Sequence, residues 1–131
     1  MLKLQNRVEI IIPHQDNNGV MIESDTINNE IENITKICGG STITEVKGQW
    51  YSDDENRIME DNNLNYEWYY DKDMKDMRDK QNLEYGLTLI TLMLIEVYKQ
   101  EAVSIKINGT LYIVDESDLN FLSYELYDLM F

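Results

Sequence analysis

The sequence predicts one acidic α+β domain, residues 1–131, in which an antiparallel β-sheet is covered by helices. Three observations predict this class. A β-branched run, 8–12, ends at Pro13; an Asn-Gly pair at 108–109 separates two β-rich segments; and segments 25–38 and 83–98 carry apolar residues at helical spacing. The length is that of one ordinary domain, without an internal repeat or an interdomain linker.

The first elements are predicted to be a strand and a helix. Residues 8–12 form the strand, 16–19 a turn and 20–22 a short extended return. Ser24 or Asp25 caps the helix, and Gly39-Gly40 ends it, because glycine enters the left-handed conformation without strain. One helical face carries Ile27, Ile31, Ile34 and Cys38.

Two further strands are predicted in the middle of the chain. Residues 41–51 are β-like, with Gly48 as a candidate bulge, and a polar turn at 52–56 leads into a short strand at 57–60. Alternation at 64–70 then marks a strand with one aromatic face, formed by Leu64, Tyr66, Trp68 and Tyr70.

The second half begins with a charged segment, 71–81, which is either a loop or the polar start of a helix. Residues 83–98 are apolar on nearly all sides and are predicted to form a central core helix. A type I′ hairpin follows at 102–114, and a short helix carries Leu119, Leu122, Leu126 and Leu129. The order is β-α-β-β-α-β, the ferredoxin-like pattern, with an extra C-terminal hairpin strand and a short terminal helix.

Charge is the strongest compositional feature, since 25 acidic residues face 11 Lys and Arg, for a formal net charge of −14. Such a chain repels nucleic acid and anionic membranes and attracts basic surfaces. The acidic side chains either serve solubility alone or form a surface that binds a basic protein. The apolar run 87–97 is far short of the roughly 20 residues that span a bilayer. Residues 1–7 lack a signal-peptide pattern, and Cys38 is the only cysteine, so we expect a bacterial host cytoplasm.

A catalytic constellation is not evident. His14 is the only histidine, and a surface turn is its favoured interpretation. Cys38 lies at the end of an apolar helix face, where burial and the helix dipole raise a thiol pKa. Asp53-Asp54-Glu55 lacks the pattern of a calcium loop, and Gly39-Gly40 is a helix stop. We therefore expect no catalytic residues, no metal, no cofactor and a non-enzymatic protein.

Two binding surfaces are candidates. A basic protein partner would contact an acidic and aromatic surface, although a core face is the favoured interpretation of the aromatic strand. The predicted residues of that surface are Trp50, Asp53, Asp54, Glu55, Glu60, Asp61, Tyr66, Trp68 and Tyr70. A small-ligand site would instead use His14, Gly39, Gly40, Arg57 and Arg78. A homo-oligomer could form through edge strand 110–114 or the C-terminal segment 119–131.

Three motifs resemble a loose group of small uncharacterised bacterial and phage proteins: Gly39-Gly40-Ser41-Thr42, Gly48-Gln49-Trp50 and Gln100-Glu101-Ala102-Val103. The resemblance covers about residues 8 to 114, implies a ferredoxin-like fold and carries over no catalytic residue. The composition is similar to that of phage-encoded inhibitors of bacterial defence. The leading hypothesis is therefore a phage or mobile-element inhibitor of a defence effector. The alternative is a sponge that sequesters a nucleotide-derived signal at an oligomer interface.

Overall fold

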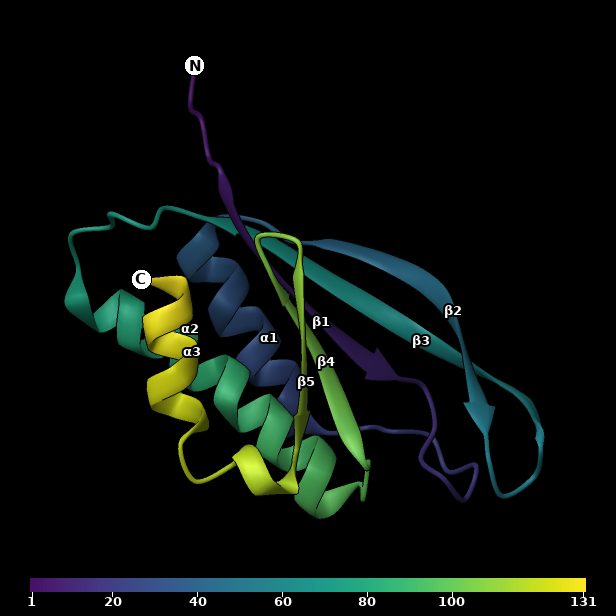
Figure 1. Cartoon of the computed structure of the whole chain (residues 1–131). Helices are drawn as coiled ribbons and strands as arrows, with labels where there is room; N and C mark the ends of the chain where they lie inside the picture. Colours follow the sequence, from purple (N-terminus) through teal and green to yellow (C-terminus); the bar gives the residue numbers. More distant parts are fainter.

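A computed structural model describes residues 1–131 and shows an α+β fold (Figure 1). The strands and helices follow one another along the chain in the predicted order. The elements are β1 (Asn6–Pro13), α1 (Asp25–Cys38), β2 (Thr42–Ser52), β3 (Arg57–Tyr70), α2 (Met77–Leu92), η1 (Met93–Val97), β4 (Ala102–Ile107), β5 (Thr110–Asp115), η2 (Glu116–Asp118) and α3 (Leu122–Met130).

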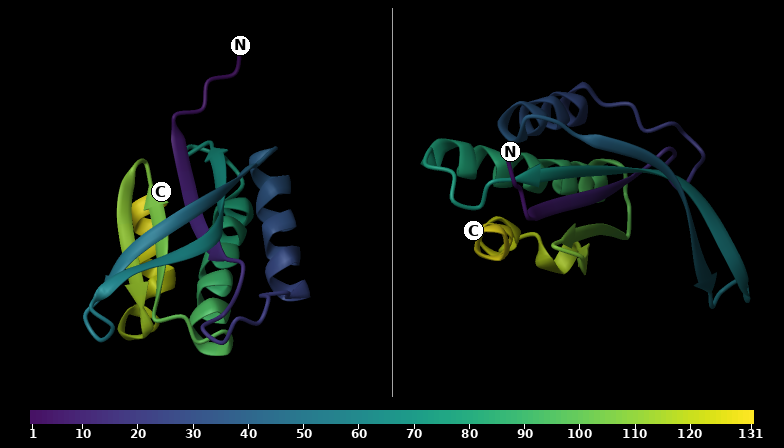
Figure 2. Two further views of the ribbon diagram at one scale, coloured as in Figure 1. Left: turned by 90° about the vertical axis from the view of Figure 1, so that its right-hand side faces the viewer. Right: turned by 90° about the horizontal axis from the view of Figure 1, so that it is seen from above.

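The five strands form one antiparallel sheet in the order β2-β3-β1-β4-β5. The first four have the spatial order of a ferredoxin-like sheet, and β5 adds the predicted extra strand at the β4 edge. Figure 2 shows that the three helices lie behind the same face of the sheet, which leaves the other face open. The predicted fold class is thus confirmed.

The core lies between this sheet and the helices. Val8, Ile10 and Ile12 alternate along β1 and are buried, while the residues between them face the open side. Ile27, Ile31 and Ile34 form the buried face of α1, and α2 is buried along most of its length, as the sequence predicts. We call the uncovered side of the sheet the open face.

The β2–β3 hairpin is longer than predicted. Residues 57–60 and 64–70 are one strand, because β3 pairs with β2 without interruption from Arg57 to Glu67. Gly48 pairs regularly with Asp61, so the expected bulge is absent. β1 pairs only with residues 63–70 of β3. Residues 47–62 therefore extend beyond the sheet as a two-stranded projection, here called the arm (Figure 1).

Other boundaries also differ from the sequence prediction. Residues 20–22 form no strand and contribute only a bridge between Gln15 and Met21. The charged segment is a loop up to Asp76, whose side chain caps α2, and α2 passes into the π-helical η1 at Met93. The last helix begins at Leu122, after the short turn η2. None of the helices combines the length and apolarity that a membrane crossing requires.

Candidate functional site

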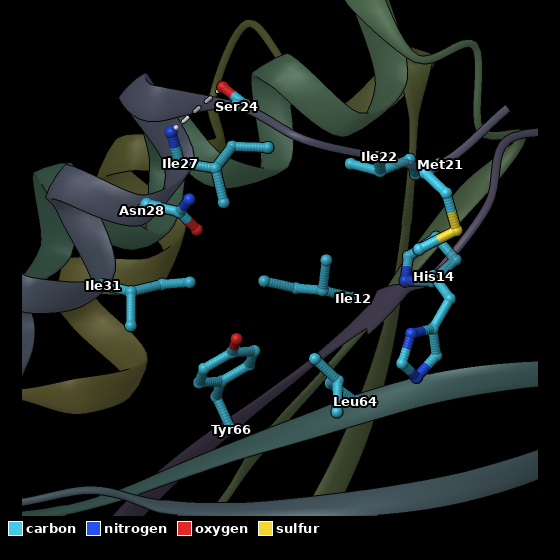
Figure 3. A pocket seen from close by; sticks show the side chains of 11 residues that line it. Ile12, His14, Met21, Ile22, Ser24, Ile27, Asn28, Ile31, Leu64 and Tyr66 are labelled. Atoms are coloured by element: carbon cyan, nitrogen blue, oxygen red, sulfur yellow. Dashed lines mark hydrogen bonds between the residues drawn. The ribbon is translucent and has the colours of Figure 1, made fainter.

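A cavity of about 190 Å³ lies between the start of α1 and the end of β1 (Figure 3). Its walls are mostly apolar. The lining residues are Ile12, Pro13, His14, Met21, Ile22, Ser24, Ile27, Asn28, Ile31, Leu64 and Tyr66. Figure 3 shows isoleucine side chains pointing inward from β1 and α1, with the Tyr66 hydroxyl directed among them.

The loop 14–22 closes one side of the cavity, and local hydrogen bonds determine its path. One carboxylate oxygen of Asp16 accepts from the backbone N–H of Asn18 and of Val20, each at 2.9 Å. Gly19 adopts a positive φ of 77° that completes the turn. The N–H of Ile22 then donates to the carbonyl of His14 at 2.8 Å, which returns the chain toward β1. This turn places Met21 and Ile22 over the end of the strand.

The start of α1 forms the opposite wall. Ser24 is the N-cap, and its side-chain oxygen accepts from the N–H of Ile27 at 3.2 Å. The cap directs Ile27 and Ile31 toward the cavity and leaves the amide of Asn28 at its rim. Sequence analysis predicted this cap without predicting that it borders a cavity.

Tyr66 provides the most distinctive polar group in the cavity. Its hydroxyl makes no hydrogen bond within the protein, unlike those of Tyr70 and Tyr98, and burial raises the pKa of Tyr66. At neutral pH this phenol is therefore protonated and available to donate a hydrogen bond to solvent or to a ligand. Its ring stacks on Trp68 at 5.9 Å between centroids, and the Trp68 indole N–H donates to Thr35 at 3.0 Å, which holds the pair in place.

Electrostatics around the cavity favour a cationic or neutral ligand. No lining residue is a carboxylate, but Asp16, Glu23 and Asp25 belong to the loop and helix start that form it. The whole chain carries a formal charge of −14. A field of this sign raises the local concentration of cations at the surface.

The predicted small-ligand site is not assembled. His14 borders the cavity, but Gly39 and Gly40 lie at the opposite end of the 14-residue α1, where Gly39 is the C-cap with a φ of 93°. Arg57 is at the tip of the arm and pairs with Glu55 at 2.8 Å, while Arg78 is exposed in the first turn of α2. Their separation on different elements leaves His14 as the one predicted ligand residue at the cavity.

The predicted partner surface is divided between the arm and the core. Trp68 is 0% exposed and Tyr70 is 1% exposed, so neither side chain can contact a partner, and Tyr66 lines the cavity. These three aromatic residues belong to the helix-covered face of β3. This corrects the sequence prediction, in which the period of two identified a common face but not the side on which it lies.

The remaining predicted residues do lie together on the arm. Trp50 is 50% exposed, and its indole N–H donates to the Asp61 carboxylate at 3.1 Å. Glu60 accepts from Gln49 at 3.0 Å, and this hydrogen bond, with the nearby charge of Lys47, lowers the pKa of Glu60. Asp53, Asp54 and Glu55 form the exposed tip. The arm is thus an acidic projection with an exposed indole.

Other titratable groups make no cluster suited to a metal. No three His, Cys, Asp or Glu side chains converge anywhere in the chain. Burial raises the pKa of Cys38 to about 12, which makes its thiol a poor nucleophile at neutral pH.

No protein-family model matches the chain, and no curated protein sequence matches it. Its fold is similar to that of a phage SAM lyase in complex with S-methyl-5′-thioadenosine, with a TM-score of 0.55 and 13% identity over 89% of this chain and 96% of the other. A phage SAM lyase in the apo state superposes with a TM-score of 0.51 and 16% sequence identity, over 88% of this chain and 94% of the other. A point mutant of CutA1 from Pyrococcus horikoshii OT3 superposes with a TM-score of 0.41 and 12% sequence identity, over 92% of this chain and 96% of the other.

The TM-scores above 0.5 show a likeness of fold to two structures of a phage protein, and the low sequence identities show no more than that. These two structures also overturn one expectation. The prediction of a non-enzymatic protein was drawn from the missing catalytic constellation, yet a phage enzyme has a similar fold. The absence of a Ser-His or Cys-His arrangement therefore does not argue against enzymatic activity on this scaffold.

Proposed function

We propose that the chain is a phage-type lyase that binds S-adenosylmethionine (SAM) and releases S-methyl-5′-thioadenosine. The observation that carries the proposal is the likeness of its whole fold to a phage SAM lyase in complex with that thioether.

The cavity beside α1 is the proposed binding site. Its volume of about 190 Å³ is below the roughly 300–1,000 Å³ of typical ligand pockets, so it would enclose only part of SAM. The flat adenine suits the apolar walls of Ile12, Ile27 and Ile31, and the free Tyr66 hydroxyl can donate to a ring nitrogen. The sulfonium and the amino-acid portion would then extend out of the cavity, past the loop 14–22 and the start of α1.

Charge supports this substrate. SAM has a net positive charge because its sulfonium and ammonium groups outnumber its single carboxylate. The formal charge of −14 attracts such a molecule, whereas an anionic nucleotide would be repelled. The sulfonium charge of SAM is also destabilised beside an apolar wall, so cleavage to a neutral thioether is favoured there.

The reaction chemistry is compatible with a site that has few catalytic groups. When the bond from sulfur to the amino-acid side chain breaks, sulfur keeps the electron pair and leaves as a neutral thioether, while an oxygen of the substrate's own carboxylate forms a bond to the released carbon and closes a five-membered lactone. The substrate thus supplies its own good leaving group. The protein must bind, orient and partly desolvate the molecule, which are contributions that hydrogen-bond donors and apolar walls can make.

The proposed removal of SAM would also give the protein a role against the defence systems of a bacterial host. SAM is the methyl donor of host methyltransferases, so its removal would starve defence systems that depend on methylation. In this form the inhibitor acts on a host metabolite. The predicted contact of the acidic arm with a basic protein stays a separate prediction, which the exposed Trp50 beside Asp61 supports.

The test is to incubate the purified protein with SAM and measure S-methyl-5′-thioadenosine by chromatography, with SAM binding followed by calorimetry. Tyr66→Phe removes only the hydroxyl and should weaken binding about fivefold, since a hydrogen bond to a ligand contributes roughly 1 kcal/mol. Tyr124→Phe, on an exposed tyrosine of α3, is the matched control and should change nothing. A protein that neither binds nor cleaves SAM contradicts the proposal. Turnover that Tyr66→Phe leaves unchanged contradicts the cavity as the site.

A further inference from the structure

Residues 15–23 form a compact surface loop at the cavity, here called the lid. Its centre is held by its own hydrogen bonds, since Asp16 accepts from two N–H groups of the turn and its own N–H donates to the Val20 carbonyl at 2.8 Å. Residues 17–20 are exposed, so little packing attaches this turn to the protein. The lid can therefore move as one unit about its two ends.

Two hydrogen bonds join the lid to another element, apart from the backbone bond that closes its neck. The Tyr98 hydroxyl donates to the carbonyl of Glu23 at 3.0 Å. The side-chain amide of Asn17 donates to the carbonyl of Lys99 at 3.3 Å. Tyr98 and Lys99 lie in the connection between η1 and β4, which is 75 or more positions away in the sequence. This connection therefore fixes the lid from outside.

The backbone of this connection has two uncommon features. The N–H of Tyr98 donates to the carbonyl of Met93 at 3.1 Å, in the i→i+5 pattern that ends the π-helical η1. Lys99 then adopts a φ of 56°, a left-handed conformation that is unfavourable for a residue with a Cβ. Both features are frequent at functional sites. Here they accompany the two groups that hold the lid, the Tyr98 hydroxyl and the Lys99 carbonyl.

The lid forms one side of the cavity. Figure 3 shows Met21 and Ile22 of the lid on one side and Ile27 of α1 on the other. The enclosed volume of about 190 Å³ is smaller than that of typical ligand pockets, roughly 300–1,000 Å³. A ligand with an adenine ring therefore requires the lid to move outward before it enters and to close around it afterwards.

We propose that Tyr98 is a positioning residue that holds the lid closed over the cavity. Opening of the lid breaks the hydrogen bond from Tyr98 to Glu23, and closure restores it. The bond therefore favours the closed lid both with and without a ligand. This inference rests on the proposed function only for the identity of the ligand, because the contact of Tyr98 with the lid exists without one.

A residue that acts in this way should change the rates of binding more than the affinity. A net hydrogen bond corresponds to a factor of about five in an equilibrium constant. In Tyr98→Phe the open fraction should therefore rise about fivefold, in the free protein and in the complex alike. Ligand entry and release should then both accelerate about fivefold, while their ratio, and with it the Kd, should change little.

The first test measures the association and dissociation rates of S-methyl-5′-thioadenosine by surface plasmon resonance. Both rates should rise in Tyr98→Phe, and also in Asn17→Ala, which removes the second hydrogen bond to the lid. The matched control is Tyr112→Phe, on a partly buried tyrosine of β5 that does not line the cavity, and it should change neither rate. A weaker Kd with an unchanged association rate would mean that Tyr98 only supports the cavity wall, and would overturn the proposal.

The second test needs no ligand. A glutamate-specific protease cuts the peptide bond of Glu23, whose carbonyl Tyr98 holds, only from the open lid. Cleavage there should accelerate about fivefold in Tyr98→Phe, while cleavage after Glu55 at the tip of the arm should keep its wild-type rate. Circular dichroism checks that the variant is folded.

The protease result separates the two proposals. Equal cleavage after Glu23 in wild type and Tyr98→Phe would overturn the role of Tyr98, even in a protein that binds SAM. Faster cleavage in a variant of a protein that binds neither SAM nor S-methyl-5′-thioadenosine would support the role of Tyr98 and contradict the proposed ligand.

Discussion

The hydroxyl of Ser123 on α3 donates a hydrogen bond to the buried carboxylate of Glu84 on α2. Thr88, one turn along α2, donates to the other carboxylate oxygen at 3.2 Å. This small polar network joins the C-terminal helix to the central core helix. These hydrogen bonds hold the start of α3, the Tyr70 hydroxyl donates to the Met130 carbonyl at its end at 3.0 Å, and Leu122, Leu126 and Met130 pack into the core.

Glu84 should make the stability of the protein depend on pH. Burial raises its pKa, and the hydrogen bonds from Ser123 and Thr88 oppose that rise. A carboxyl with a raised folded pKa contributes stability that is present below its unfolded pKa and lost as pH rises through the folded pKa. Wild type should therefore lose stability relative to Glu84→Gln as the pH rises above 4.5, the ordinary pKa of a glutamate. Urea unfolding of both proteins on both sides of this pH measures the difference, and parallel pH profiles would refute the assignment.

Gly86 should be required for the contact between α1 and α2. A Cβ built at Gly86 would lie 2.9 Å from Cγ1 of the fully buried Ile34. Alanine favours a helix by about 1 kcal/mol over glycine, but overpacking costs about 1–3 kcal/mol, so Gly86→Ala should destabilise the protein on balance. In an Ile34→Ala background the same change should become stabilising. Gly40→Ala, where no atom lies within 4 Å, is the control, and a destabilising Gly86→Ala in both backgrounds would exclude this explanation.

The two tryptophans should report separate parts of the molecule. Trp68 is fully buried with its indole N–H bonded to Thr35, whereas Trp50 is half exposed on the arm. In Trp50→Phe the remaining fluorescence should be blue-shifted and shielded from acrylamide. In Trp68→Phe it should be red-shifted and readily quenched. Equal quenching of the two variants in the folded state would contradict the burial of Trp68.

Cys38 should react slowly with thiol reagents. Burial raises its pKa to about 12, so at pH values near neutrality very little thiolate is present. Labelling with iodoacetamide should be slow in the native protein and should accelerate by more than about tenfold in denaturant, since each pKa unit changes the thiolate fraction tenfold. Fast native labelling would show that Cys38 is accessible and ionised.

Several elements could be predicted because their signals are local. Ser24 caps α1 and Gly39 ends it, as the serine hydroxyl and the backbone freedom of glycine predict. The Asn108-Gly109 turn has the positive φ values that the type I′ assignment requires. These interactions join residues a few positions apart, so the spacing of residue types is sufficient to identify them.

The site was harder to predict because it is formed by distant segments. Tyr66 was assigned to a partner surface, and its place in the cavity depends on α1 and on the loop 14–22. Glu84 was not singled out, because the hydroxyl that contacts it is 39 residues away on another helix. The length of β3 was underestimated, since its polar middle is stabilised by pairing with β2.

The sequence by itself determined the α+β class, the element order, the turn types and the acidic field, because propensity, periodicity and charge are properties of neighbouring residues. Only the tertiary structure decided that Trp68 faces the helices, that Tyr66 borders a cavity, and that Leu111 and Ile113 lie on a free edge. An alternating strand presents two faces of equal period. The packing of the helices on one of them decides which side chains are buried and which remain available to bind.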